Sequence, residues 1–260
     1  MLPVVLVHGG AHGAWCWAPT AERMVAPTVA VDLPPVSVRG GPDRHLDVPE
    51  LRTLTVADFA AAVLAAADAA GFDRFVLGGH SLAGITIPEV ARRAPERVAH
   101  LVFLACSVPP EGGSVLDCLD GDVAAMARTN LAAQLAAPPG ATLPPMDDDL
   151  ARSMFGTDLD EPTWQFVVDH LGAEVMSVMD EPVSRAGLDP GIQKTWIRPT
   201  RDAVVDPTAQ LRFVAHLEAV PGGPVTVVDL DTGHDAMLAR PADLARLLDG
   251  IASAPPGGGH

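Results

Sequence analysis

The sequence predicts an α/β protein built on a mostly parallel sheet of about six strands, with helices on both faces. Runs rich in valine, isoleucine and leucine recur along the 260-residue chain, and most are continuously apolar rather than alternating. Unbroken apolar runs are typical of parallel strands that are covered on both faces. Helical patterns lie between several runs, which is typical of a doubly wound sheet. The expected strands are PVVLVH (3–8), TVAVDL (28–33), RFVLGG (74–79), RVAHLVFLA (97–105), KTWIRP (194–199) and PVTVVDL (224–230).

The clearest predicted helix is TVADFAAAVLAAADAAG, between the second and third expected strands. Thr55 and Asp58 have the spacing of a capping box, in which each side chain accepts a hydrogen bond from the other residue's backbone. Gly71 stands where the helix should stop, because glycine readily adopts the left-handed conformation that ends helices.

Residues 107–190 interrupt the alternation of strands and helices. They contain no convincing strand, carry four prolines between 138 and 145, and include an acidic run at 147–149. Helix-compatible pieces lie at 122–137 and 162–172, and so long a stretch needs structure of its own. We therefore predict a helical insertion between two sheet strands. The acidic run is expected to be a solvated face rather than a metal site.

The length fits one large domain that carries an inserted segment. We expect residues 1–106 and 191–252 to form the core, residues 107–190 the insertion, and residues 253–260 a flexible tail.

Composition and charge exclude several classes of partner. A hydrophobic fraction of 48% with 19% charged residues is ordinary for a soluble globular protein. The formal net charge of -16 at pH 7 argues against binding to nucleic acid or to an anionic membrane, because such a chain repels polyanions. We expect the partner to be a small molecule.

The three cysteines and the N-terminus favour a cytoplasmic location. Cys16, Cys106 and Cys118 lack the spacing of a metal site, and their odd number fits a reducing compartment. The opening MLPVVLVHGG lacks a basic leader, so we interpret it as a first strand rather than a signal peptide. No apolar stretch is long enough to span a bilayer.

Ser81 is the candidate nucleophile. It lies in GGHSLAG (78–84), at the corner between an expected strand and the helix that begins near Leu82. A sharp strand-to-helix turn holds a serine in a sparsely populated conformation that exposes its Oγ. Gly79 and Ala83 supply the small neighbours that such a turn needs, although the usual G-x-S-x-G pattern has glycine where Ala83 stands. The alternative is an ordinary serine N-cap.

His234 is the candidate general base among nine histidines. It follows the strand at 224–230 in DTGHDAML, so it should lie on a loop at a strand's carboxyl end. His100, His170 and His216 fall within expected strands or helices, and we interpret them as packed or solvated side chains.

A carboxylate must hold such a histidine in the right tautomer, and TRDAVVDP offers Asp202 and Asp206. Asp206 precedes Pro207 at the start of a helical run, which is a natural N-cap position. We therefore favour Asp202 as the third member of the candidate triad.

The chain resembles the α/β-hydrolase superfamily over nearly all of residues 2–252. VLVHGGAHGAWCW (5–17) and the GHS elbow resemble the plant methyl esterase and hydroxynitrile lyase group and its bacterial esterase relatives. This resemblance implies that 107–190 is a cap over the pocket and that the backbone N–H groups of Gly10 and Leu82 form an oxyanion hole. It also makes a homodimer plausible by analogy. We expect no cofactor and no metal.

Three functions stay open on the sequence. The favoured one is a serine esterase that cleaves small carboxylic esters through an acyl-enzyme. The others are a lyase or carbon–carbon hydrolase on the same fold, and a ligand-binding module. Hydroxynitrile lyases of the group resemble one another in a threonine and a lysine where this chain has Gly9 and Asp235, so both departures favour hydrolysis.

Six residues of the insertion could line an apolar pocket or form the small core of the insertion itself. They are Met126, Met154, Phe155, Trp164, Met176 and Met179.

Overall fold

A six-stranded sheet forms the centre of the molecule, and every pair of neighbouring strands is parallel. The computed structural model describes residues 1–35, 51–119, 121–138, 141, 146–172, 174–219 and 223–254. The strand order β2-β1-β3-β4-β5-β6 confirms the predicted fold class. The strands are β1 (Val4–Val7), β2 (Thr28–Val31), β3 (Phe75–His80), β4 (Val98–Leu104), β5 (Gln193–Pro199) and β6 (Val225–Leu230).

The order of the strands reverses at β1. Strand β2 lies on one side of β1, and β3 lies on the other side. The order in which strands are added to the sheet therefore changes direction at β1. In open parallel sheets such a switch point leaves a crevice beyond the carboxyl ends of the strands. Val7 pairs with Gly79, so the loops that follow β1 and β3 begin side by side.

Two apolar cores, one on each face of the sheet, explain the unbroken apolar runs. Along β1, Val5 and Val7 belong to one core, whereas Val4 and Leu6 belong to the other. Alternate side chains of a strand point to opposite faces, so a strand covered on both faces must be apolar throughout.

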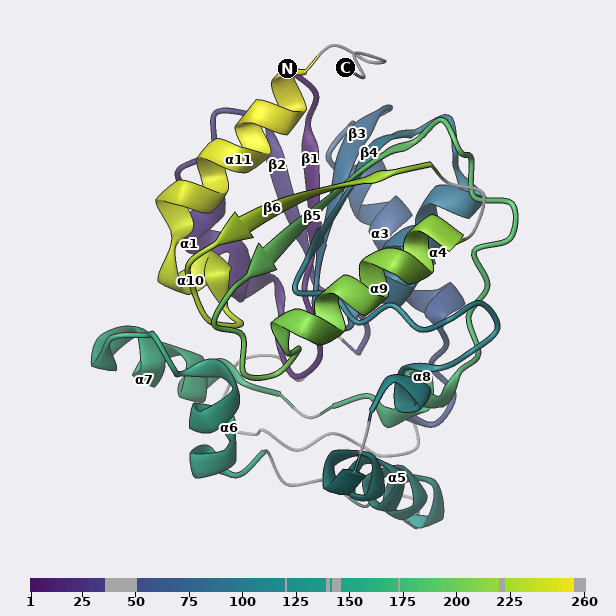
Figure 1. The fold of residues 1–260 in the computed structure, drawn as a ribbon, viewed down its shortest axis with the longest axis vertical. Helices are drawn as coiled ribbons and strands as arrows, with labels where there is room; N and C mark the ends of the chain where they lie inside the picture. The colour runs from purple at the N-terminus through teal and green to yellow at the C-terminus, as the bar shows by residue number, and fades with distance from the viewer. Residues whose placement is uncertain are drawn as a thin grey trace.

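Each core is closed by its own set of helices (Figure 1). Helices α3 (Val56–Ala69), α4 (Ala83–Arg93) and α9 (Pro207–Ala219) contribute to the first core. The second core includes η1 (Ala14–Trp17), α10 (Ala236–Ala239) and α11 (Pro241–Ser253), and α1 (Ala18–Ala21) lies beside them.

Helix α3 begins and ends as the sequence predicts. The Asp58 backbone N–H donates to Thr55 Oγ1 at 3.2 Å, and the Thr55 N–H donates to Asp58 Oδ2 at 2.9 Å. Gly71 follows the helix with a φ of 69°, in the left-handed region.

Residues 105–192, called the β4–β5 segment below, contain helices and no strand among their described residues. Figure 1 shows these helices grouped beyond the end of the sheet toward which the strands run. Pro139, Pro144 and Pro145 lie outside the described residues. The helices of the segment are η3 (Val115–Cys118), α5 (Gly121–Ala136), α6 (Asp148–Phe155), α7 (Glu161–His170) and α8 (Met176–Asp180).

The acidic run at 147–149 is solvent-exposed and begins α6. The Asp147 side chain accepts hydrogen bonds from the N–H groups of Asp149 and Leu150, as an N-cap does. Carboxylates are favourable in the first turn of a helix, so the run needs no metal to explain it.

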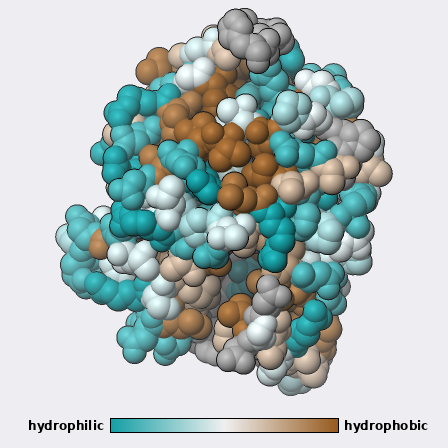
Figure 2. All heavy atoms as spheres, viewed as in Figure 1, coloured by the Kyte–Doolittle hydropathy of each residue, from teal (hydrophilic) through white to brown (hydrophobic). Residues whose placement is uncertain are grey.

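The molecular surface is mixed in polarity. Figure 2 shows apolar side chains gathered over β5 and β6, between α11 and α9. Val227 on β6 is 39% exposed there. Within the described residues, no helix combines the length and the apolarity needed to cross a membrane. Most of the predicted tail, residues 255–260, lies outside the described residues.

Candidate active site

Four loops at the carboxyl edge of the sheet carry the candidate site residues. Gly10 follows β1, Ser81 follows β3, Asp202 follows β5 and His234 follows β6. Parallel strands bring their carboxyl ends to one edge, so side chains far apart in sequence meet there.

Ser81 stands at a strained corner. Its φ is 53°, which a residue with a side chain adopts only when its surroundings impose it. The Ser81 N–H donates to the Leu104 carbonyl, and the Ser81 carbonyl accepts from the Ser107 N–H, both at 3.0 Å. Hydrogen bonds to the next strand and its loop therefore hold the corner in place.

The glycines near Ser81 leave too little room for a side chain. A Cβ placed on Gly9 would lie 2.7 Å from Ser81 Cβ, and one placed on Gly79 would lie 3.0 Å from Ala83 Cβ. Helix α4 has Leu82 at its N-cap and no side-chain cap hydrogen bond. The structure thus gives Ser81 a backbone geometry different from that of an ordinary serine N-cap.

Asp202 and His234 form a buried pair. His234 Nδ1 lies 3.0 Å from Asp202 Oδ1 and 2.9 Å from Oδ2. The carboxylate also accepts hydrogen bonds from the Val204 and Val205 N–H groups and from Gln210 Nε2. Burial lowers the pKa of His234, but the Asp202 carboxylate opposes this and the net direction is upward.

The orientation of His234 leaves its other nitrogen available. Nδ1 faces the carboxylate, and Nε2 is buried without a hydrogen-bond partner among the described residues. His80, the residue before Ser81, approaches the same loop: its Nε2 lies 3.1 Å from the His234 carbonyl oxygen. The two imidazole rings are 4.5 Å apart between centroids.

Asp206 lies elsewhere. It is exposed and accepts hydrogen bonds from the backbone N–H groups of Thr208 at 2.8 Å and Ala209 at 3.4 Å. These bonds lower the pKa of Asp206 and cap α9. Of the two aspartates weighed from the sequence, Asp202 is the one that contacts His234.

Gly10 and Leu82 border one small cavity of about 10 Å³. The peptide that carries the Gly10 N–H is fixed through its other end, because His8 Nδ1 lies 2.7 Å from the Gly9 carbonyl oxygen. The Leu33 N–H donates to His8 Nε2 at 3.1 Å, so His8 carries its proton on Nδ1 and donates it to Gly9.

His12, His80 and Asp235 form a second buried cluster that the sequence analysis did not assign to the site. His12 Nε2 lies 3.1 Å from Asp235 Oδ2, and His12 Nδ1 lies 2.8 Å from the Gly10 carbonyl oxygen. His80 Nε2 lies 3.9 Å from Asp235 Oδ1. The cluster therefore joins the end of β3 to the loops after β1 and β6.

The charges in this cluster follow from its contacts. Burial alone would raise the pKa of Asp235, but His12 overcomes this effect and the pKa is lowered. Burial lowers the pKa of His80 well below its ordinary value. A sequence signal was present, because His80 and Asp235 are the immediate neighbours of Ser81 and His234, and His12 lies in the HGAW stretch.

The side chains of His80, His234 and Asp235 place possible metal-ligand atoms within 4.8 Å of one another. His234 Nδ1 is engaged by Asp202, and His80 Nε2 by a carbonyl oxygen. Because these contacts account for the arrangement, we assign no metal to it.

The other histidines considered in the sequence have structural partners. His100 Nε2 lies 2.9 Å from Thr195 Oγ1, and His216 Nδ1 lies 2.8 Å from the Val108 carbonyl oxygen. His170 Nδ1 lies 2.7 Å from the Phe166 carbonyl oxygen within α7.

Phe155 is the insertion residue that reaches the buried histidines. Its ring centroid lies 5.8 Å from that of His234 and 4.9 Å from that of His12. Met176 and Met179 instead pack in a small apolar cluster around α5 and α8, whereas Met126 is 45% exposed. Met154 and Trp164 belong to the second core.

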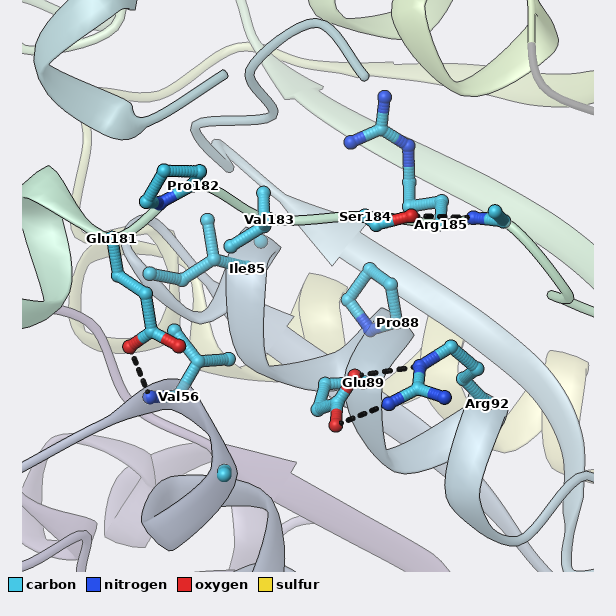
Figure 3. A pocket seen from close by; sticks show the side chains of 13 residues that line it. Val56, Ile85, Pro88, Glu89, Arg92, Glu181, Pro182, Val183, Ser184 and Arg185 are labelled. Atoms are coloured by element: carbon cyan, nitrogen blue, oxygen red, sulfur yellow. Dashed lines mark hydrogen bonds and ion pairs between the residues drawn. The ribbon is translucent and has the colours of Figure 1, made fainter. Parts of the chain in front are cut away.

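A larger cavity of about 340 Å³ lies between α4 and residues 181–186 (Figure 3). The Glu89–Arg92 ion pair lies on one side of it, and Glu181 accepts from the Val56 N–H on another. Within the described part of the chain, its lining includes no member of the Ser81, Asp202 and His234 set.

Comparison with known proteins identifies the family of the chain. The sequence matches the Alpha/beta hydrolase family over residues 4–247. It is 28% identical over 254 residues to a carbendazim hydrolyzing esterase of Nocardioides, covering 95% of this chain and 98% of that protein. A probable esterase of rice, Oryza sativa, is 37% identical over 110 residues, 42% of this chain and 40% of its own. Methylesterase 7 of Arabidopsis thaliana is 34% identical over 107 residues, 40% of each chain.

Solved structures share the fold. An extracellular alpha/beta-hydrolase from Paenibacillus superposes with a TM-score of 0.77 at 18% identity, covering 98% of this chain and 100% of that one. A pyrethroid hydrolase from Sphingobium faniae gives a TM-score of 0.70 at 22% identity, covering 98% of each chain. The relatives found by sequence confirm the predicted resemblance to plant methylesterases and bacterial esterases, and their class agrees with the predicted enzyme class. The chain belongs to the α/β-hydrolase family.

Proposed function

We propose that this protein is a serine hydrolase that cleaves small carboxylic esters through an acyl-enzyme. The observation that carries the proposal is the orientation of the His234 ring. Its Nδ1 is held by the buried Asp202 carboxylate, and its Nε2 is left without a partner among the described residues. A histidine oriented in this way is ready to take a proton from a nearby hydroxyl.

The proposed reaction begins with attack of Ser81 Oγ on the ester carbonyl, while His234 Nε2 takes the hydroxyl proton. The N–H groups of Gly10 and Leu82 stabilise the oxyanion that develops. His234 then gives the proton to the departing alcohol, and water repeats the sequence to release the acid. In this proposal the β4–β5 segment acts as the cap over the substrate.

The relatives support an ester as the substrate. A relative matched over almost its full length is a carbendazim hydrolyzing esterase, and the plant relatives include a methylesterase. Asp235 argues against cyanohydrin cleavage, because its lowered pKa keeps a buried negative charge beside the base where a departing cyanide would need a cation.

The test is covalent capture. A fluorophosphonate probe should add to the wild-type protein at Ser81, as shown by peptide mass spectrometry, and should not label Ser81→Ala. Ser153→Ala, which changes an exposed serine of α6, is the matched control and should be labelled like wild type. A slowly deacylating ester should leave its acyl group on Ser81. Full esterase activity in Ser81→Ala, or mandelonitrile cleavage without any acyl adduct, would refute the proposal.

A further inference from the structure

Glu174 places a carboxylate against Gly10. Gly10 lies in the loop after β1, which supplies a proposed oxyanion donor and is called the oxyanion loop below. A Cβ placed on Gly10 would lie 2.6 Å from the Glu174 carboxyl carbon and 2.8 Å from its Oε1. Because such a Cβ stands close to the Gly10 backbone, these distances put the carboxylate in contact with the glycine itself. Glu174 therefore lies at the site where the proposed reaction develops negative charge.

The backbone around Glu174 is tied on both sides. The Gln134 side chain on α5 donates to the Glu174 carbonyl at 2.8 Å and accepts from the Met176 N–H at 3.1 Å. The Gly172 N–H donates to the Ala11 carbonyl at 2.7 Å, which joins this stretch to the oxyanion loop. Gln134 is only 3% exposed, so these hydrogen bonds of its side-chain amide are shielded from water. The Val175 N–H also donates to Glu174 Oε1 at 3.0 Å, so the carboxylate is held beside Gly10 together with its backbone.

The space that Glu174 shares with Gly10 and Leu82 is otherwise mostly apolar. Leu33, Phe59 and Val175 line the same cavity. The remaining volume of about 10 Å³ is no more than about one water molecule needs and is too small for an acyl group. An acyl group that reaches the oxyanion hole must therefore displace the carboxylate sideways and then lie next to it.

We propose that Glu174 determines specificity by selecting the charge of the acyl group. The carboxylate favours acyl groups that carry a cation or an N–H donor near the ester carbonyl, and it rejects anionic ones. In a site with little water, like charges a few ångströms apart repel strongly and an opposite charge is attracted. This inference rests on the proposed serine esterase function.

Three methyl esters of similar acyl length and different charge test the inference. They are methyl butyrate (neutral), β-alanine methyl ester (cationic) and monomethyl succinate (anionic), each followed by methanol release at pH 7. The measured quantity is the ratio of kcat/KM for the anionic ester to kcat/KM for the cationic one. In Glu174→Gln this ratio should rise by roughly tenfold to a hundredfold over wild type, which corresponds to a modest like-charge repulsion.

Matched variants separate this effect from general damage. Glu161→Gln removes an exposed carboxylate at the start of α7 and should leave the ratio unchanged. Glu174→Asp keeps the charge but withdraws it by one methylene, so its ratio should lie between those of wild type and Glu174→Gln. Circular dichroism of each variant establishes that it is folded.

Each outcome decides the inference. An unchanged ratio in a folded Glu174→Gln overturns it, and so does an equal increase for all three esters, because a carboxylate that only obstructs the site would not discriminate charge. If one of these two results is found and Ser81→Ala no longer hydrolyses methyl butyrate, the proposed function stands while the role of Glu174 fails. If Ser81→Ala hydrolyses it normally, the proposed function itself fails.

Discussion

Two buried histidine–aspartate pairs lie next to each other in the molecule, and they differ in what the second ring nitrogen contacts. In the His234–Asp202 pair, Nε2 has no partner among the described residues. In the His12–Asp235 pair, Nε2 faces the carboxylate and Nδ1 faces the Gly10 carbonyl. In the proposed mechanism the first pair keeps a nitrogen for proton transfer, whereas the second pair uses both nitrogens of His12 in contacts with Asp235 and Gly10. The same two residue types can thus serve chemistry or position, depending on the second nitrogen.

The two pairs are also mechanically connected. Asp235 is the next residue after His234, and His12 holds the carbonyl of Gly10, a proposed oxyanion donor. The β4–β5 segment adds a further contact, since Asp158 Oδ2 accepts from Thr232 Oγ1 at 2.8 Å and from the Gly233 N–H at 2.6 Å. The loop that carries the proposed base is therefore held from both sides.

The largest effect is expected from the first pair. Asp202→Asn should lower kcat by up to roughly 10⁴-fold, because an amide no longer holds His234 in the tautomer with Nε2 free to accept a proton. Steady-state kinetics on a small ester measures this loss. Asp206→Asn is the matched control and should keep wild-type activity, since asparagine also caps helices. A large loss in Asp206→Asn with normal activity in Asp202→Asn would reverse the assignment.

A smaller effect is expected from the second pair. His12→Asn should lower kcat by about 10- to 100-fold with little change in KM, because the oxyanion loop loses the contact that fixes the Gly10 carbonyl. The same kinetics measures this change, and circular dichroism checks that the variant is folded, since removing one partner of a buried pair is destabilising. A loss as large as that of Asp202→Asn would mean that the two pairs do not have separate roles.

The sequence could predict the first pair, but for the second it could mark only the neighbourhood of the residues and not their contact, for a physical reason. Ser81, Asp202 and His234 each follow an apolar run, so the sequence places all three at the carboxyl edge of a parallel sheet once the strands are recognised. His12 and Asp235 are 223 residues apart, and their contact depends on how two loops pack. Glu174 was missed for the same reason, because its place beside Gly10 follows from the packing of the β4–β5 segment and not from a local pattern.

The helices of that segment illustrate the same limit. Helices α5 and α7 fall where helical patterns were predicted, at 122–137 and 162–172. Helices α6 and α8 have only 8 and 5 residues, too few turns for an apolar periodicity to be recognised.

Asp235 should also influence the pH dependence of the reaction. Burial lowers the pKa of His234, whereas Asp202 and Asp235 raise it, and the net direction is upward. His80 also lies against this ring, and burial keeps its imidazole neutral. The base must be unprotonated, so activity rises with pH through the pKa of His234. Asp235→Asn removes a negative charge, and the acid limb of the kcat/KM profile should therefore shift to lower pH. An acid limb that stays in place would show that Asp235 acts only by holding His12.

The smallest effect is expected at Asp206, which lies outside both pairs. Asp206→Ala removes the side chain that accepts from the Thr208 and Ala209 N–H groups, so the first turn of α9 loses its cap. Helix α9 supplies Gln210, whose amide donates to Asp202 Oδ2 at 3.2 Å, and loosening of the helix start could reach the first pair by this path.

We expect the body of the helix to stay in place, because Phe213 and Val214 are anchored in the first core. Thermal unfolding followed by circular dichroism should show a melting temperature lower by a few degrees, while kcat stays within about twofold of wild type. A fall in kcat that approaches that of Asp202→Asn would show that the orientation of Asp202 depends on the α9 cap.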